Sequence, residues 1–301
     1  VMIVTAMVAV IAMVQALGLF GVPEFLFEYY TAFQGETADI GRGSSTLALS
    51  FAVADIMVIG LGIVAGLMRG ASAQELRTLA AFGAVFLLGA VAAGQFSGYI
   101  GLFVAVLAIA IGLRDRRAAT IGLGAALVGS LILWPVVAGR LSGFGGGGVP
   151  SSWTGRLNNL RDYVMPELTE GFHWLVGVRP AARITALEPW RQYVYIESGY
   201  LWLLWTGGLV MMVAFGYLMY RGLRAAWLAI ERGPRPITGA GLGTFVGLAV
   251  IVVLTLFDPH LTMRGTADLI FPLLAMTLVG VGESALRPEM PIQTKGMVGS
   301  R

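Results

Sequence analysis

Long apolar runs alternate with short polar connections along most of the chain. Because they are continuous, and not alternating apolar and polar, they predict helices and not the strands of a membrane β-barrel. A helix needs about 20 apolar residues to cross a bilayer, and runs near that length lie at 2–20, 46–68, 79–95, 98–113, 119–138, 198–220, 239–257 and 266–282. The pattern therefore predicts an all-α, polytopic bundle of eight transmembrane helices.

Composition agrees with a membrane protein. Of the 301 residues, 57% are hydrophobic and 12% are charged, and the mean hydropathy is +0.79. A soluble domain carries about 25% charged residues, so soluble enzymes and nucleic-acid modules are excluded and membrane lipids are the expected surroundings. The chain has no Cys, which also excludes disulfide-stapled folds and thiolate chemistry.

Basic residues gather on one side of the predicted bundle. The short connections and the tail on that side carry twelve of the 20 basic residues: Arg69, Arg77, Arg114, Arg116, Arg117, Arg221, Arg224, Arg232, Arg235, Arg287, Lys295 and Arg301. The positive-inside rule assigns that side to the cytoplasm. We therefore expect five helices in 1–138, an extracytoplasmic loop at 139–197, three helices in 198–285 and a cytoplasmic tail at 286–301. Since Val1 opens directly into an apolar run, the natural N-terminus is expected to be missing.

The long outer loop is rich in arginine. It holds Arg140, Arg156, Arg161, Arg179, Arg183 and Arg191, with Trp and Tyr residues between them. These arginines are either solvated residues of a loop that translocates regardless of its charge, or they form an anion site. A guanidinium group can bind two phosphate oxygens through two parallel hydrogen bonds. Helical spacing over 157–170 that ends at Gly171 predicts that the loop is partly helical.

Short motifs in and around this loop resemble those of the O-antigen ligase/polymerase superfamily of bacterial membrane glycosyltransferases. They are Gly41-Arg42-Gly43-Ser44-Ser45-Thr46, Gln95-Phe96-Ser97-Gly98, Thr154-Gly155-Arg156, Val176-Gly177-Val178-Arg179-Pro180, and Glu197-Ser198-Gly199-Tyr200-Leu201 with Gly208 and Leu209. The family places His where this chain has Glu197, and has more spans, so the resemblance is to a divergent and N-terminally truncated member.

The resemblance implies a GT-C-like bundle in the bacterial cytoplasmic membrane, with its active site on the extracytoplasmic face. It implies transfer or polymerisation of glycan from a polyprenyl-diphosphate-linked donor to a glycan or lipid-glycan acceptor, without a metal ion or other cofactor. The competing hypothesis is a transporter or lipid-linked glycan flippase. A transporter would place polar residues through several spans, whereas Asp55 is the clearest such residue here.

Seven residues are the candidate site. Glu197 is predicted to be the general base for the acceptor hydroxyl, although a carboxylate before a helix can also simply favour the helix N-terminus. Arg156 is predicted to act in catalysis by meeting the charge of the departing diphosphate. Further candidates for binding the substrate are Arg179, Arg183, Arg191, Arg42 and Arg264.

Three other polar residues stand near or inside the predicted spans. An acid inside a span is costly unless paired, so Asp55 has either a function or a structural partner on a neighbouring helix. Asp258 and His260 lie at an outer boundary, and no metal site is assigned to them.

Overall fold

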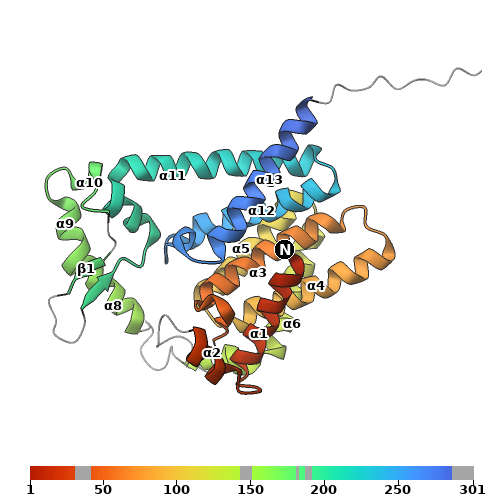
Figure 1. Ribbon diagram of the computed structural model, residues 1–301, viewed down its shortest axis with the longest axis horizontal. Helices are drawn as coiled ribbons and strands as arrows, with labels where there is room; N and C mark the ends of the chain where they lie inside the picture. The colour runs from red at the N-terminus through yellow and green to blue at the C-terminus, as the bar shows by residue number, and fades with distance from the viewer. Residues whose placement is uncertain (31–41, 143–150, 181–182, 187–191, 287–301) are drawn as a thin grey trace, which may run out of the picture.

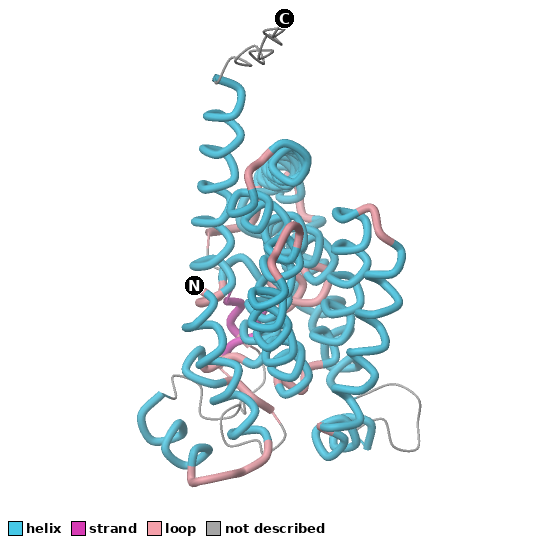
Figure 2. The backbone as a smooth tube through the Cα atoms, turned by 90° about the vertical axis from the view of Figure 1, so that its right-hand side faces the viewer, coloured by secondary structure: helices cyan, strands magenta, loops and turns pink. Residues whose placement is uncertain are grey.

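The structure is a computed structural model, and it describes residues 1–30, 42–142, 151–180, 183–186 and 192–286 (Figure 1). About 81% of the described residues are helical. Within the described ranges the strands form a single two-stranded antiparallel sheet (Figure 2). The all-α prediction is therefore confirmed.

The first half of the chain forms α1 (Met2–Ala16), α2 (Val22–Tyr30), η1 (Ser45–Leu47), α3 (Ser50–Met68), α4 (Ala73–Ala92), α5 (Phe96–Leu113), α6 (Arg116–Ile132) and α7 (Trp134–Ser142). The middle forms α8 (Ser151–Asn159), a π-helical turn η2 (Leu160–Val164), α9 (Met165–Thr169), α10 (His173–Val176), β1 (Arg183–Thr185) and β2 (Tyr193–Tyr195). The last part forms α11 (Gly199–Arg232), α12 (Arg235–Leu254), η3 (His260–Thr262) and α13 (Thr266–Leu286).

Within the described part of the chain, five helices are long and apolar enough to cross a membrane: α3, α4, α5, α11 and α12. A sixth span results if α6 and α7 are counted together, although they are bent by 83°. The apolar helices at Met2–Ala16 and Thr266–Gly282 are shorter. The described helices therefore support fewer spans than the eight predicted.

The predicted helix at 119–138 is wrong as a single straight span. α6 ends at Ile132 and α7 begins at Trp134, one residue before Pro135. Proline has no backbone N–H, and its ring collides with the carbonyl of the preceding turn. It also disfavours helical backbone at the residue before it. The 83° bend thus follows from a residue that hydropathy alone counts as apolar.

Helices α3 and α12 form the centre of the bundle. Both spans are 72% buried inside the molecule, whereas α4 is 33% buried. Gly62 and Gly66 of α3 face Gly239 and Gly243 of α12, and a Cβ added to Gly66 would lie 2.8 Å from the Cα of Gly239. Small residues four apart on both helices let the backbones approach closely, so a side chain at these positions would force the two helices apart.

The middle segment forms a separate packed layer beside the bundle, at the left of Figure 1. Its apolar cluster joins η2, α9, both strands and the first part of α11, with Val164, Leu168, Ile184, Val194 and Trp205 buried together. The strands pair with Ile184 opposite Val194. This confirms that the predicted loop is partly helical, and it places η2 and α9 against the start of α11.

Candidate functional site

A cleft with a volume of about 190 Å³ lies between the middle segment and the end of the bundle at which α12 ends and α11 begins. α8 contributes Trp153 and Arg156, the chain before α11 contributes Glu197, and the turn after α12 contributes Leu256 and Phe257. Most of the other lining side chains are apolar. The cleft is therefore apolar with charged groups at one place, which suits a ligand that is part lipid and part polar.

The charged groups belong to what we call the outer cluster, Arg156, Glu197 and Asp258. Nε of Arg156 is ion-paired with Oε2 of Glu197, and its Nη2 lies 3.6 Å from Oδ1 of Asp258. The side chains of Arg156, Glu197 and Asp258 are 35%, 37% and 20% exposed. One guanidinium thus stands between two carboxylates, within reach of solvent.

Burial raises the pKa of Glu197 above the ordinary value of a glutamate, and the neighbouring Arg156 offsets part of this rise. A carboxylate with a raised pKa is a better proton acceptor for a hydroxyl than an ordinary surface glutamate. The environment of Glu197 therefore fits the general base predicted from the sequence.

Backbone contacts hold the two halves of the outer cluster together. The carbonyl oxygen of Thr255 accepts hydrogen bonds from the backbone N–H groups of Gly199, at 2.8 Å, and Tyr200, at 3.3 Å. These N–H groups open α11 and have no partner inside the helix. A Cβ on Gly199 would lie 3.1 Å from the carbonyl oxygen of Asp258. Glycine at 199 thus allows α11 to start against the turn that carries Asp258.

A second polar group lies inside the bundle, and we call it the buried cluster: Asp55, His260 and Thr266. Nδ1 of His260 and Oγ1 of Thr266 each donate to Oδ2 of Asp55 at 2.7 Å. The side chains of His260 and Asp55 are 0% and 2% exposed. Asp55 therefore has structural partners on one carboxylate oxygen, Oδ2, and they come from residues more than 200 positions away in sequence.

The buried cluster anchors the turn that serves the outer cluster. Asp258 follows α12, His260 begins η3, and Thr266 begins α13. The ring of Phe257 packs on Trp153 of α8, with the ring centroids 6.0 Å apart. One short stretch of chain thus contacts Asp55 inside the bundle, Arg156 at its surface, and α8 in the middle segment.

The structure brings together Arg156 and Glu197 of the seven predicted residues. Arg179 lies elsewhere, with its guanidinium 5.7 Å from the ring centre of Trp205. Among the described cleft-lining residues neither Arg42 nor Arg264 is present, and Arg264 is exposed between η3 and α13. Arg183 pairs through its backbone with Tyr195, while its side chain, like all of Arg191, lies outside the described residues.

The glycine-rich motifs around Arg179 have a packing role. The backbone N–H of Val178 donates to the carbonyl oxygen of Trp205 at 2.7 Å. Gly208 kinks α11 with φ of +64°, and a Cβ there would lie 2.1 Å from the carbonyl oxygen of Leu175. Only glycine tolerates both this backbone conformation and this approach. The motif at 176–180 therefore packs through backbone atoms against the segment of α11 that contains Gly208.

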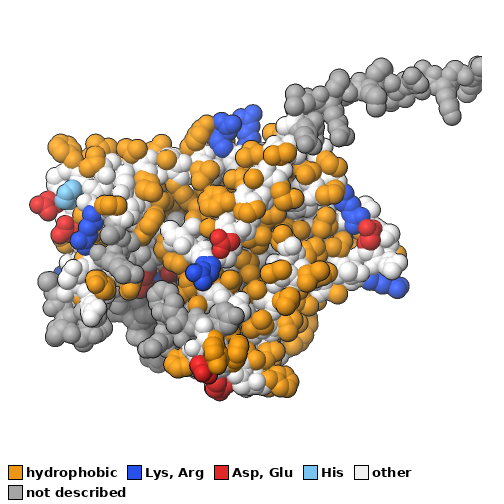
Figure 3. Space-filling view, in the orientation of Figure 1, with side chains coloured by type: hydrophobic (Ala, Val, Ile, Leu, Met, Phe, Trp, Pro, Cys, Tyr) orange, Lys and Arg blue, Asp and Glu red, His pale blue; other side chains and the backbone are white. Residues whose placement is uncertain are grey.

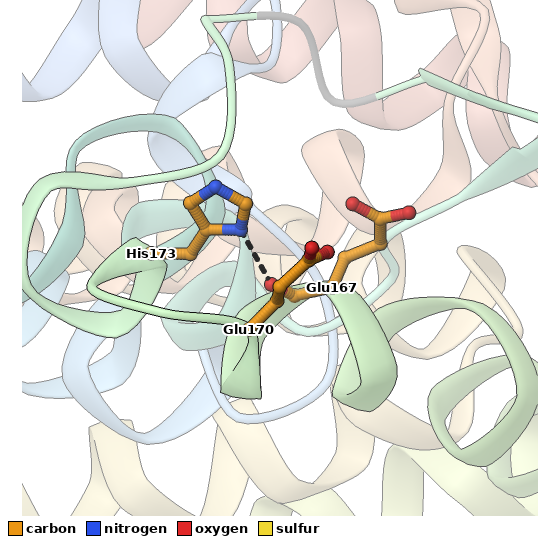
Figure 4. A group of neighbouring side chains, drawn as sticks. All are labelled: Glu167, Glu170 and His173. Carbon is orange, nitrogen blue, oxygen red and sulfur yellow. Dashed lines mark hydrogen bonds between the residues drawn. The ribbon is translucent and has the colours of Figure 1, made fainter.

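One further group could hold a metal ion. Glu167 and Glu170 of the α9 region and His173 of α10 have ligand atoms within 4.8 Å of one another (Figure 4). Nδ1 of His173 lies 2.7 Å from the carbonyl oxygen of Glu167, and both glutamates are exposed. The regular spacing of three residues is the signal by which the sequence could have revealed this group.

Sequence reasoning also missed Asp258 as a partner of Arg156. Nothing in its local sequence indicates the contact, because α8 and the turn after α12 meet only through the tertiary fold. Comparisons of the chain with protein-family models, with curated proteins and with solved structures find no match.

Proposed function

We propose that the protein is a membrane glycosyltransferase that moves glycan from a polyprenyl-diphosphate-linked donor to a glycan or lipid-glycan acceptor. The proposal includes a GT-C-like bundle in the bacterial cytoplasmic membrane and an active site on its extracytoplasmic face. It rests on one observation above all: Arg156 and Glu197 meet in one cleft with apolar walls, although separate motifs predicted them to stabilise the departing diphosphate and to act as the base.

The proposed reaction needs one base and one cation. A carboxylate oxygen of Glu197 takes the proton of the acceptor hydroxyl as that oxygen forms a bond to the anomeric carbon. The bond from this carbon to the diphosphate oxygen breaks, and its electron pair leaves with the diphosphate. Arg156 stabilises the negative charge that develops there, as fixed donors do in other transfer reactions.

The charge balance of the outer cluster adds a condition. One arginine and two carboxylates carry a net charge of −1, which by itself repels a diphosphate. We propose that the donor takes the place of Glu197 on the guanidinium, while Asp258 keeps Arg156 in position. Donor binding would then release the base at the moment when the leaving group is held.

The alternative function is transport, as a permease or a lipid-linked glycan flippase. The observation that favours it is the buried Asp55–His260 pair, since ionisable groups inside a bundle often serve ion or proton pathways. Both side chains are buried among the described residues, so the pair has no contact with solvent. It also lies near an end of α3, whereas a transport site is expected near the midplane. We therefore favour glycan transfer over transport as the function.

The test is turnover by the full chain in lipid nanodiscs, with a fluorescent undecaprenyl-diphosphate-linked oligosaccharide as donor and unlabelled oligosaccharide as acceptor. Transfer should proceed in the presence of EDTA. Glu197→Gln should lower single-turnover rates by about 10² or more without weakening donor binding, because it removes the carboxylate that competes with the diphosphate for Arg156. Arg156→Gln should weaken donor binding as well as turnover.

Arg161→Gln is the matched control, because its side chain is 87% exposed and lies on η2 beside the same cleft wall. It should turn over like the unmodified protein. Normal rates in Glu197→Gln would remove the proposed base. Donor movement across the bilayer of proteoliposomes without glycan transfer would instead establish the flippase.

A further inference from the structure

A second hollow lies on the other half of α11. It is a groove of about 650 Å³ between α11 and α13. Its walls are largely apolar, formed by Leu218 of α11 with Leu274, Leu278 and Val281 of α13, while Arg221 and Arg224 line it as well. The cleft of the outer cluster uses α11 only as far as Leu201, so the two sites are separate.

The residues of the groove indicate its depth in a membrane. The apolar run predicted at 198–220 ends directly before Arg221. Tyr217 and Tyr220 are 60% and 59% exposed, and Tyr and Trp gather where the hydrocarbon meets the polar headgroups. By the positive-inside rule, Arg221 and Arg224 belong to the cytoplasmic side. The groove thus combines apolar walls at acyl-chain depth with two guanidinium groups at headgroup depth.

The two arginines differ in their contacts from others assigned to the same side. Arg114 pairs with Glu231 and lies over Trp227, and Arg235 pairs with Glu75 at 2.9 Å. Arg221 donates to the hydroxyl of Tyr217 at 2.7 Å, and the described residues offer neither Arg221 nor Arg224 a carboxylate partner. Figure 3 shows Lys and Arg side chains gathered at the upper edge of the molecule, bordered by hydrophobic ones, near where α13 passes α11 in Figure 1.

We propose that this groove binds one anionic phospholipid of the cytoplasmic leaflet. The phosphate of the lipid is held by Arg221 and Arg224, and one acyl chain lies between Leu218 and the leucines of α13. Guanidinium groups bind phosphate oxygens through paired hydrogen bonds, and basic pockets between helices on this side suit anionic headgroups. A zwitterionic lipid fills the same apolar walls but carries a cation that the arginines repel.

The test is native mass spectrometry of the full chain in detergent micelles that contain equal amounts of phosphatidylglycerol and phosphatidylcholine with the same acyl chains. The unmodified protein should retain phosphatidylglycerol about 25-fold more than phosphatidylcholine. The double variant Arg221→Gln/Arg224→Gln should lose this preference. Each arginine near the headgroup is expected to contribute about fivefold to the preference for phosphatidylglycerol.

Two further variants separate a site from general charge and from simple apolar contact. Arg116→Gln/Arg117→Gln removes the same charge from exposed positions on α6, and it should keep the preference. Leu278→Trp fills the groove at a side chain that is 53% exposed, and it should reduce retention of both lipids. Equal retention of the two lipids by the unmodified protein, or an equal loss in both double variants, would overturn the proposal.

Discussion

The outer cluster and the buried cluster use the same kinds of groups in different surroundings. Each pairs a carboxylate with a nitrogen base or cation, and each depends on the turn that follows α12. The pair of Arg156 and Glu197 is more than one-third exposed, whereas Asp55 and His260 are sealed from solvent. Exposed ion pairs contribute about 0–1 kcal/mol to stability, so the difference separates a site that can exchange partners from one that must keep them.

The largest effect is expected from His260→Leu. This change leaves the carboxylate of Asp55 buried with only the Thr266 hydroxyl, and removal of one partner from a buried pair costs about 3–5 kcal/mol. The double variant Asp55→Asn/His260→Leu should be more stable than His260→Leu, since it removes the uncompensated charge as well. The free energy of unfolding of each variant is measured by titrating the solubilised protein with SDS and following Trp fluorescence. A single variant that is more stable than the double one would contradict the pairing.

A smaller effect is expected from pH. Burial alone would lower the pKa of His260, but Asp55, through its charge and its hydrogen bond, raises it above the ordinary value, with a contribution from Asp258. A group whose pKa is raised in the folded state contributes its full stabilisation below about pH 6.5, the pKa of the unfolded state. This stabilisation is lost as the pH rises through the pKa of the folded state.

The free energy of unfolding should therefore fall above about pH 6.5, with a slope of up to about 1.4 kcal/mol per pH unit. The measurement is the same SDS titration repeated between pH 5.5 and 8.5. The decline should be absent in Asp55→Asn/His260→Leu. An equal decline in that double variant would assign the pH dependence to other groups.

The smallest effect on stability is expected in the outer cluster. Arg156→Gln breaks both of its ion pairs, yet the free energy of unfolding should change by no more than about 1 kcal/mol, because the pairs are screened by solvent. Arg161→Gln provides the baseline for loss of one arginine from the middle segment. A loss of more than about 2 kcal/mol in Arg156→Gln alone, which is beyond the range of exposed ion pairs, would make the outer cluster structural like the buried one.

Much of the architecture follows from local sequence. Continuous apolar runs determine that the chain is helical, because a buried backbone in an apolar setting must satisfy its own hydrogen bonds. The proline that separates α6 from α7 acts within one turn, so its effect could be read from local sequence, whereas the facing glycines of α3 and α12 meet only in the tertiary structure. Hydropathy missed the bend between α6 and α7 because it counts proline as an apolar residue without regard to its backbone.

The sites depend on the tertiary structure. Local sequence assigned Glu197 and Arg156 to separate motifs, and it left Asp55, Asp258 and His260 as isolated polar residues. Their pairings join α3 to η3, and α8 to the turn after α12, over separations that no short window contains. Burial then sets the chemistry, since it raises the pKa of Glu197 and makes the partner of Asp55 indispensable. Sequence alone determined which groups are present, and the packing of distant segments decided which of them face one another and how much water reaches them.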